Sequence, residues 1–280
     1  MEDLVGDAAR CVLAVHARQG PRQGPCLSPM ALWSDGTALW MSAPAGSAVI
    51  EALLRRPDCV LYVPPAKVGE RATVVRGRAR VFGLGDPVGL VLHAPTVATA
   101  MAALAVHNAP SLAGYVQDAA RVPRRLTPRN RVAVKVSVLG LRAMDPPVAG
   151  PGIAPALPTE VPPDVRRALA GERRAVLAVS DEGPDGELLV APVIWGAGMV
   201  LSGPPVAGLP SAGGASAGAP AALAVTSDPS PRPTATVGLV LAGRLVADRF
   251  TPTCATWWHG FDMDTADVAP RPAGGIVLPD

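Results

Sequence analysis

The chain has 280 residues and a formal net charge of +2, with 25 Lys and Arg against 23 Asp and Glu. A single hydrophobic core usually serves about 100–200 residues, so this length predicts two domains. Hydrophobic residues make up 49% of the chain, which excludes global disorder. The near-balanced charge argues against a nucleic-acid-binding protein, because such domains carry an excess of clustered Lys and Arg.

Cysteine and histidine spacing gives no sign of a metal site. The four cysteines form no C-x-x-C pair, and no H-E-x-x-H motif links the four histidines. The acidic N-terminal stretch lacks the apolar run of a signal peptide, and the uncharged segment 87–117 is interrupted by prolines and consists mostly of small residues. We therefore expect a cytoplasmic protein with neither a membrane nor a nucleic acid as partner.

Short apolar runs bounded by Gly and Pro predict a first half rich in strands. In chain order, we expect a helix over 2–10, strands over 11–16, 26–33 and 37–42, a helix over 46–56, and strands over 59–63 and 71–82. Asp35 and Gly36 lie between two of these strands and favour a tight hairpin, because glycine readily adopts positive φ. Pro57 ends the second helix, since proline cannot continue one.

An alanine-rich insertion over 86–124 interrupts the first half. Within it we expect a helix over 97–106, bounded by Pro95 and Pro110, and a second short helix over 111–120. Alternating valines then predict a last strand over 127–141. The Pro-rich segment 145–163 is expected to be a semi-extended linker, followed by a short helix over 162–170.

The two halves share short sequence patterns in the same order. The matched pairs are 11–15 with 175–179, 28–33 with 191–195, 39–42 with 199–202, 72–78 with 235–244, and 125–128 with 249–252. Random apolar strings would not keep this order, so we expect a duplicated domain. The predicted division is 1–144, a linker over 145–163, and a degenerate second domain over 164–280. The predicted fold is mainly β (α+β), with two tandem antiparallel split β-barrels and short helices that form a pseudo-dimer within one chain.

The first half resembles the pyridoxamine 5'-phosphate oxidase-like family of FMN-binding split barrels. The resemblance rests on CVLAV at 11–15, SPMALW at 28–33, ALWMSAPAGS at 38–47, RRPDCVLYV at 55–63 and VVRGRARV at 74–81. It covers nearly all of 1–82 and, more weakly, 165–250. Most members bind FMN, and some bind deazaflavin or haem instead. The resemblance implies a flavin-type oxidoreductase acting on a small molecule that the sequence does not identify.

The same resemblance indicates where the cofactor phosphate would lie. Ser42 and Ser47 match the family positions near the flavin phosphate, and Ser47 opens a helix whose free N–H groups attract an anion. A helix N-cap explains Ser47 equally well without a ligand. Arg76 and Arg78, on a later strand, are candidate cations. The family often has a lysine two residues after the serine, whereas this chain has Val49, so weaker phosphate binding is expected.

The backbone of Pro29, Met30 and Ala31 is the support that the resemblance implies for the flavin ring, and ordinary barrel core is the alternative for Met30. No catalytic residue is assigned. A decayed barrel that serves as a small-molecule binder or scaffold is the rival interpretation, and a haem-binding variant that uses His259 is a third. A homodimer and a monomer with an internal pseudo-dimer are both open.

Overall fold

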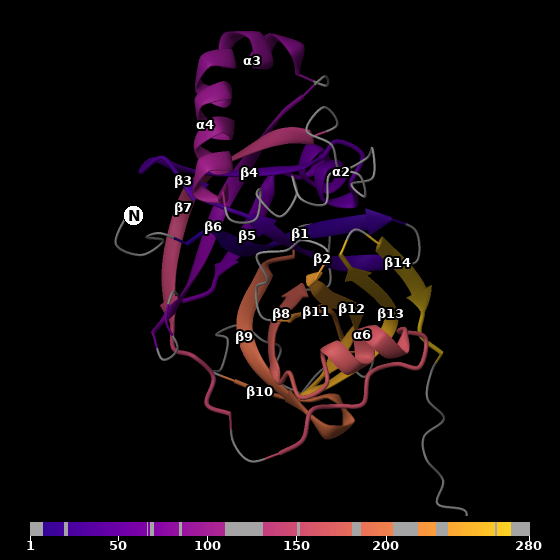
Figure 1. The fold of residues 1–280 in the computed structure, drawn as a ribbon. Helices are drawn as coiled ribbons and strands as arrows, with labels where there is room; N and C mark the ends of the chain where they lie inside the picture. Colours follow the sequence, from indigo (N-terminus) through magenta and orange to yellow (C-terminus); the bar gives the residue numbers. More distant parts are fainter. Residues whose placement is uncertain are drawn as a thin grey trace, which may run out of the picture.

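The chain folds into two antiparallel sheets, which lie one above the other in Figure 1. The computed structural model describes residues 8–19, 22–65, 67, 70–83, 86–109, 131–149, 152–180, 186–203, 218–227, 235–260 and 262–269. Each sheet has seven strands in this part of the chain, and the helices are short. The mainly β fold with two tandem split barrels is therefore confirmed.

The first sheet has the strand order β2-β1-β5-β6-β7-β4-β3. Its strands are β1 (Arg10–Gln19), β2 (Arg22–Ala31), β3 (Trp33–Ser34), β4 (Ala38–Pro44), β5 (Asp58–Val63), β6 (Ala72–Phe82) and β7 (Arg131–Met144). Helix α2 (Ala48–Arg55) buries its apolar side in the core of this barrel. Helices α3 (Pro87–Leu92) and α4 (Ala94–His107) form the described part of the insertion.

Two predicted helices of the first half fall largely or wholly outside the described residues. The helix expected over 111–120 lies outside them altogether. The helix expected over 2–10 lies outside them for residues 2–7, and its last residue, Arg10, already begins strand β1.

The second sheet has the strand order β10-β9-β8-β11-β12-β13-β14. Its strands are β8 (Arg174–Ser180), β9 (Leu188–Gly196), β10 (Val200–Ser202), β11 (Ala219–Thr226), β12 (Val237–Val246), β13 (Arg249–His259) and β14 (Asp262–Asp267). A 3-10 turn, η4 (Ala197–Met199), joins β9 to β10. Strand β10 also pairs with β13, which closes the second sheet into a barrel.

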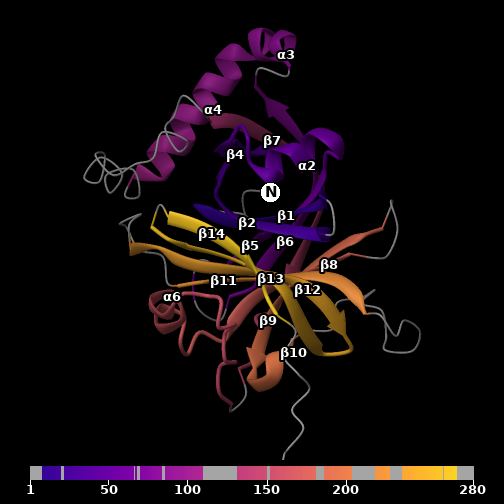
Figure 2. The ribbon, with the colours of Figure 1, turned by 90° about the vertical axis from the view of Figure 1, so that its right-hand side faces the viewer.

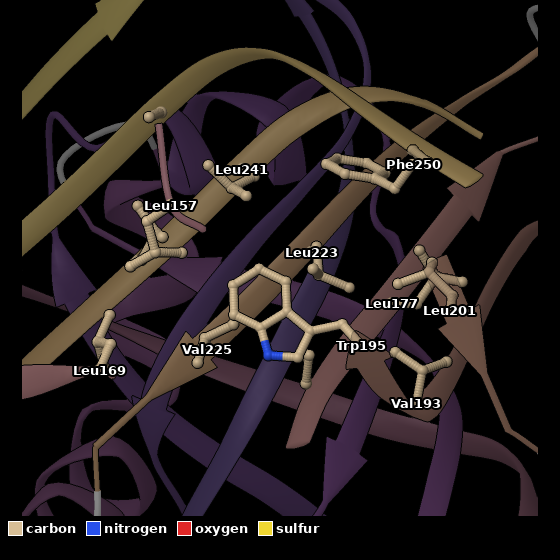
Figure 3. Close-up of a cluster of buried hydrophobic side chains, with 14 of the residues drawn as sticks. Leu157, Leu169, Leu177, Val193, Trp195, Leu201, Leu223, Val225, Leu241 and Phe250 are labelled. Carbon is tan, nitrogen blue, oxygen red and sulfur yellow. The ribbon is translucent and has the colours of Figure 1, made fainter. Parts of the chain in front are cut away.

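Trp195 lies in the centre of the second barrel, among leucines and valines from several strands and close to Phe250 (Figure 3). Leu157 and Val161 join this core together with α6 (Pro163–Ala168). The second part of the predicted linker therefore packs against the second barrel. The exact domain boundaries stay predictions.

The hydrogen-bond register equates the two halves residue by residue. Leu13 pairs with Leu61, and Leu177 pairs with Leu223 in the same way. A bulge interrupts the β6–β7 ladder at Gly77 and the β12–β13 ladder at Gly243. Strands β1, β2, β5, β6 and β7 thus correspond to β8, β9, β11, β12 and β13, as a duplicated domain requires.

One of the sequence matches between the halves is wrong. Arg78 pairs with Ser137 on β7, and its counterpart Arg244 pairs with Thr251 on β13. Residues 249–252 therefore correspond to 135–138 and not to 125–128, which lie outside the described part of the chain. The match rested on a shared arginine, threonine and proline, and three letters do not fix a register.

Side chains alternate between the barrel interior and the other half of the molecule. Along β1, Leu13 points into the first barrel, whereas Ala14 packs in a core shared by both sheets. Along β8, Leu177 and Ala178 divide in the same way. Because both faces of these strands are buried, they carry continuous apolar runs.

The contact between the halves is reciprocal. Strand β2 packs on β11, and its counterpart β9 packs on β5, the counterpart of β11. Figures 1 and 2 show the two sheets facing each other along these strands. Reciprocal contacts of this kind are those of a two-fold dimer interface, here formed within one chain. At its rim, Arg76 forms an ion pair with Glu187 at 2.8 Å.

The predicted hairpin forms between β3 and β4, with Gly36 at φ 85°. The Asp35 carboxylate accepts hydrogen bonds from the Trp40 indole at 2.7 Å, from Thr37 Oγ1 at 2.7 Å, and from the backbone N–H groups of Thr37 and Ala38 at 2.8 and 2.7 Å. Burial raises the pKa of Asp35, but these hydrogen bonds outweigh it and lower the pKa to about 2.

The Asp35 carboxylate should make the stability of the protein depend on acid pH. Because its folded-state pKa lies below the unfolded value, ionised Asp35 stabilises the fold above about pH 4, and this contribution is lost as the pH falls towards 2. In urea unfolding, wild type should lose more stability over this interval than Asp35→Asn, which has no charge to lose. Parallel pH profiles for the two proteins would contradict this role.

The shared bulge should be sensitive to a side chain at its glycine. A Cβ on Gly243 would meet the Thr251 carbonyl oxygen and lie 2.9 Å from the Pro252 Cα, and backbone cannot move aside cheaply. Gly243→Ala should lower the free energy of unfolding by about 1–3 kcal/mol. Gly140→Ala is the control, because nothing lies within 4 Å of that Cβ, and its change should stay within about 0.5 kcal/mol. Equal effects of the two substitutions would contradict the bulge argument.

Candidate functional site

Ser42 lies near the end of β4, on the outer face of the first barrel. Its neighbours Met41 and Ala43 point into the barrel core, so Ser42 points outward, where it is nevertheless buried. Arg131, the first residue of β7, donates from Nε to Ser42 Oγ at 2.9 Å and from Nη2 to the Ser42 carbonyl oxygen. The structure therefore brings a guanidinium to one of the two predicted serines.

Ser47 caps helix α2, where its Oγ accepts a hydrogen bond from the Ile50 N–H at 3.4 Å. Its own N–H donates to the Pro44 carbonyl at 3.1 Å, and Pro44 is paired with Arg131 across the β4–β7 ladder. Ser42, Ser47 and Arg131 thus lie around one turn, which we call the β4–α2 corner. The cap role of Ser47 is present without any ligand.

Val49, at the position of the family lysine, is buried in the barrel core and faces away from solvent. The cation at the corner comes instead from Arg131, which the sequence reasoning missed. A signal was present, because Arg131, Ala133 and Lys135 alternate with three valines and so share one face of a strand. Pairing that face with β4 requires the register across the insertion, which the sequence does not give.

The two predicted arginines of β6 lie further along the sheet. Ser42, Ala133 and Phe82 form one row across β4, β7 and β6, whereas Arg78 is in the row of Ser137. Four residues of strand separate these rows, or about 13 Å. Arg76 lies further away still and is paired with Glu187. The structure does not bring Arg76 to the β4–α2 corner.

The predicted support for the flavin ring lies on β2, and its three residues differ in the direction and exposure of their side chains. Met30 packs against the barrel core, and its sulfur lies 3.6 Å from Ser28 Oγ. Pro29 is exposed, and Ala31 is half-buried. The side chain of Met30 therefore has the ordinary core role, which leaves the backbone of this segment as the candidate contact.

An aromatic layer adjoins the corner on the same outer face. Trp40, two residues before Ser42 on β4, is fully buried and stacks on Phe82 with ring centroids 5.9 Å apart. Lys135 Nζ lies 5.6 Å from the centroid of the Trp40 ring. Val97 and Ala100 of α4 cover this layer. The insertion therefore packs on the barrel face that carries the corner.

In the described part of the second half, Ser42 of the corner has a counterpart but Arg131 does not. Val200 pairs with Arg249 as Trp40 pairs with Lys135, so Ser202 corresponds to Ser42. The turn at 247–248 joins β12 directly to β13, and the residue that corresponds to Arg131 by count is Leu245 of β12. No residue of β13 therefore occupies the place that Arg131 has at the start of β7.

The aromatic cluster near the C-terminus has structural roles. Trp257 belongs to the second barrel core, and the Trp258 ring lies directly over Gly238. His259 is exposed, and its Nδ1 lies 2.8 Å from a carboxylate oxygen of Asp164 in α6. Among the described residues, no group of three His, Cys, Asp or Glu side chains could hold a metal ion.

Comparison with known proteins gives similarity in fold only. No family model matches the chain, and no curated protein matches it. Among similar solved structures, one is described as a putative pyridoxamine 5'-phosphate oxidase from Listeria innocua (13% identity, 50% of this chain, 92% of that chain, TM-score 0.31). A second is described as an F420 reductase (18% identity, 50% and 94%, TM-score 0.33). A third is a FAD-binding protein from Mesorhizobium loti (17% identity, 50% and 87%, TM-score 0.36).

Proteins named for the family that the sequence resembles are thus among the similar structures. At these identities and TM-scores, the similarities bear on neither cofactor nor substrate. Among the helices in the described ranges, none is long and apolar enough to cross a membrane.

The cysteines are unsuited to nucleophilic chemistry. Burial raises the pKa of Cys59 to about 12 and that of Cys26 to about 11, and it also raises the pKa of Cys11. Cys254 is likewise buried. Because the thiolate is the reactive species, thiols with such values stay protonated and inert near neutral pH.

The native protein should therefore react slowly with Ellman's reagent at about pH 8, and the denatured protein should release four thiols' worth of colour. Rapid labelling of Cys11, Cys59 or Cys254 in the folded protein would contradict the burial of these three side chains.

Proposed function

We propose that this chain is a flavin-binding split-barrel protein that holds the phosphate of FMN at the β4–α2 corner and acts as an oxidoreductase on a small molecule. The observation that carries the proposal is the Arg131 guanidinium bonded to Ser42 beside the N-terminus of α2. The fold, the two serines that the family resemblance indicated, and this arginine together supply the support.

The donor set of the corner fits a phosphate dianion. Arginine presents several N–H donors in a planar fork that matches phosphate oxygens, and the first N–H groups of α2 have no partner within the helix. The positive end of the helix dipole adds to this attraction. Ser47 offers a hydroxyl at the same helix start, where it already accepts from Ile50. Arg131 thereby supplies the charge that Val49 lacks.

The remaining contacts belong to the chain itself. The backbone of Pro29–Ala31 is the proposed support for the ring, and Ser42 orients Arg131 through its hydroxyl and carbonyl oxygens. When bound, FMN supplies the hydride-transfer chemistry. The protein then needs to bind, orient and exclude water, which agrees with the lack of an obvious acid–base pair in the sequence.

The rival interpretations predict different absorption spectra for the purified protein. A deazaflavin or FMN gives a flavin-type absorption band, a haem variant gives a Soret band, and a scaffold without a cofactor is colourless. A protein that purifies without colour and ignores added FMN would support the decayed-barrel interpretation.

Arg131→Met tests the corner. In a fluorescence titration, this substitution should weaken FMN binding by about 10–100-fold, the equivalent of losing one charge-assisted hydrogen bond. Riboflavin has the same ring without the phosphate, so its affinity should be the same for wild type and Arg131→Met. Arg142→Met is the matched control, because Arg142 is an exposed arginine of the same strand, eleven residues away. Equal FMN affinity of wild type and Arg131→Met would overturn the corner as a phosphate site.

A further inference from the structure

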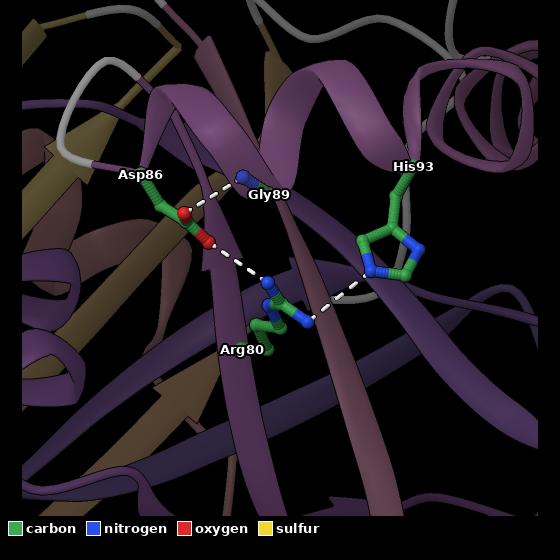
Figure 4. A network of polar contacts seen from close by, with 4 residues as sticks. All are labelled: Arg80, Asp86, Gly89 and His93. Atoms are coloured by element: carbon green, nitrogen blue, oxygen red, sulfur yellow. Dashed lines mark hydrogen bonds and ion pairs between the residues drawn. The ribbon is translucent and has the colours of Figure 1, made fainter.

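A polar network ties the helical insertion to the first barrel. Figure 4 shows Arg80 of β6 between Asp86, the N-cap of α3, and His93, where α3 ends and α4 begins. Arg80 Nη2 donates to Asp86 Oδ2 at 3.0 Å, and Arg80 Nη1 lies 3.3 Å from His93 Nε2. The second Asp86 oxygen accepts from the Gly89 N–H at 2.9 Å.

The network packs closely around Gly89. A Cβ on Gly89 would run into the Asp86 carboxylate and lie 2.5 Å from Arg80 Nη2. Below the guanidinium, the Phe82 ring centroid is 5.1 Å from Arg80 Cζ and 5.7 Å from the His93 ring, which meets it edge-on. Arg80, His93 and Phe82 thus form one packed unit between β6 and the joint of α3 and α4.

The contact between Arg80 and His93 is a hydrogen bond only when the histidine is neutral. A guanidinium can only donate, so His93 Nε2 must accept, and its proton then lies on Nδ1. A protonated imidazole has no lone pair to accept with, and it would place a second positive charge 3.3 Å from Arg80. Protonation therefore replaces a hydrogen bond with repulsion between two cations.

We propose that His93 is a pH-sensitive latch that holds the α3–α4 insertion against the first barrel while neutral and loosens it when protonated. The proposal goes beyond the flavin hypothesis and needs no cofactor. Since α4 covers Trp40, two residues before Ser42, release of the insertion would uncover the barrel face beside the β4–α2 corner.

Some charges near His93 favour its protonation, and others oppose it. Asp86 attracts a protonated His93, but its two oxygens are already engaged by Arg80 and Gly89. Lys135 of β7 is the cross-strand partner of Arg80, and its Nζ lies over the Trp40 ring. Asp35 accepts from the Trp40 indole N–H. The backbone of His93 begins the longer helix α4, where a positive charge opposes the helix dipole. It also ends the short α3, where the dipole favours the charge.

Asp86 itself does not titrate in the range of the switch. The hydrogen bonds from Arg80 and from the Gly89 N–H lower its pKa, so its carboxylate stays ionised at about pH 5.5. A response between about pH 8 and pH 5.5 therefore reports on histidine.

Hydrogen exchange of the full-length protein tests the latch. After correction for the intrinsic rates, the amides of Val97, Ala100 and Leu104 in wild type should lose about two- to tenfold protection on going from about pH 8 to pH 5.5, the equivalent of one hydrogen bond. His93→Gln keeps a side-chain acceptor without a titrating group, so its protection should not change with pH. His107→Gln, at the other end of α4, is the control and should respond as wild type does.

Arg80→Met removes the repelling cation and the bond to Asp86 together. The α4 amides of this variant should exchange faster than those of wild type at both pH values. Their protection should not differ between the two pH values. Unchanged protection of α4 in wild type across this interval, or a wild-type response in His93→Gln, would overturn the latch. The readout uses no flavin, so failure of the flavin proposal would leave it intact.

Discussion

The structure depends on burying both faces of the strands where the two halves meet. Along β1 and β8, one set of side chains fills a barrel, and the alternate set packs between the sheets. Ala14, Ala178 and Ala222 belong to this shared layer, and small side chains let the sheets approach closely. Since each barrel covers an apolar face of the other, neither half would be adequately covered alone. The tandem arrangement follows from this requirement.

The same requirement explains what could be predicted from the sequence. Runs such as CVLAV and AVLAV are apolar on both faces, and their repetition in order predicted two barrels and most strand positions. Arg131 was missed because its pairing with β4 spans the insertion, where no local pattern fixes the register. The ion pair of Arg76 with Glu187 depends on how the halves pack, which strand periodicity does not report. Strand β14 was also missed, because half of its residues Asp262–Asp267 are acidic and nearly all of them are exposed.

The two halves share a fold but differ around the corner, and one connection accounts for the difference. In the first half, the long connection between β6 and β7 lets β7 begin at Arg131, opposite Pro44. In the second half, a tight turn joins β12 to β13, so Leu245 takes the corresponding place in the chain. The insertion thus adds both the helices that cover the barrel face and the strand residue that gives the corner its charge.

The number of FMN molecules bound by each chain tests this account most directly, because it depends on both the corner and the asymmetry of the halves. Calorimetric titration of the full-length protein is predicted to give one FMN per chain. Two equal sites per chain would show that the second half keeps a corner without Arg131. No binding at all would show that the β4–α2 corner does not receive a flavin phosphate.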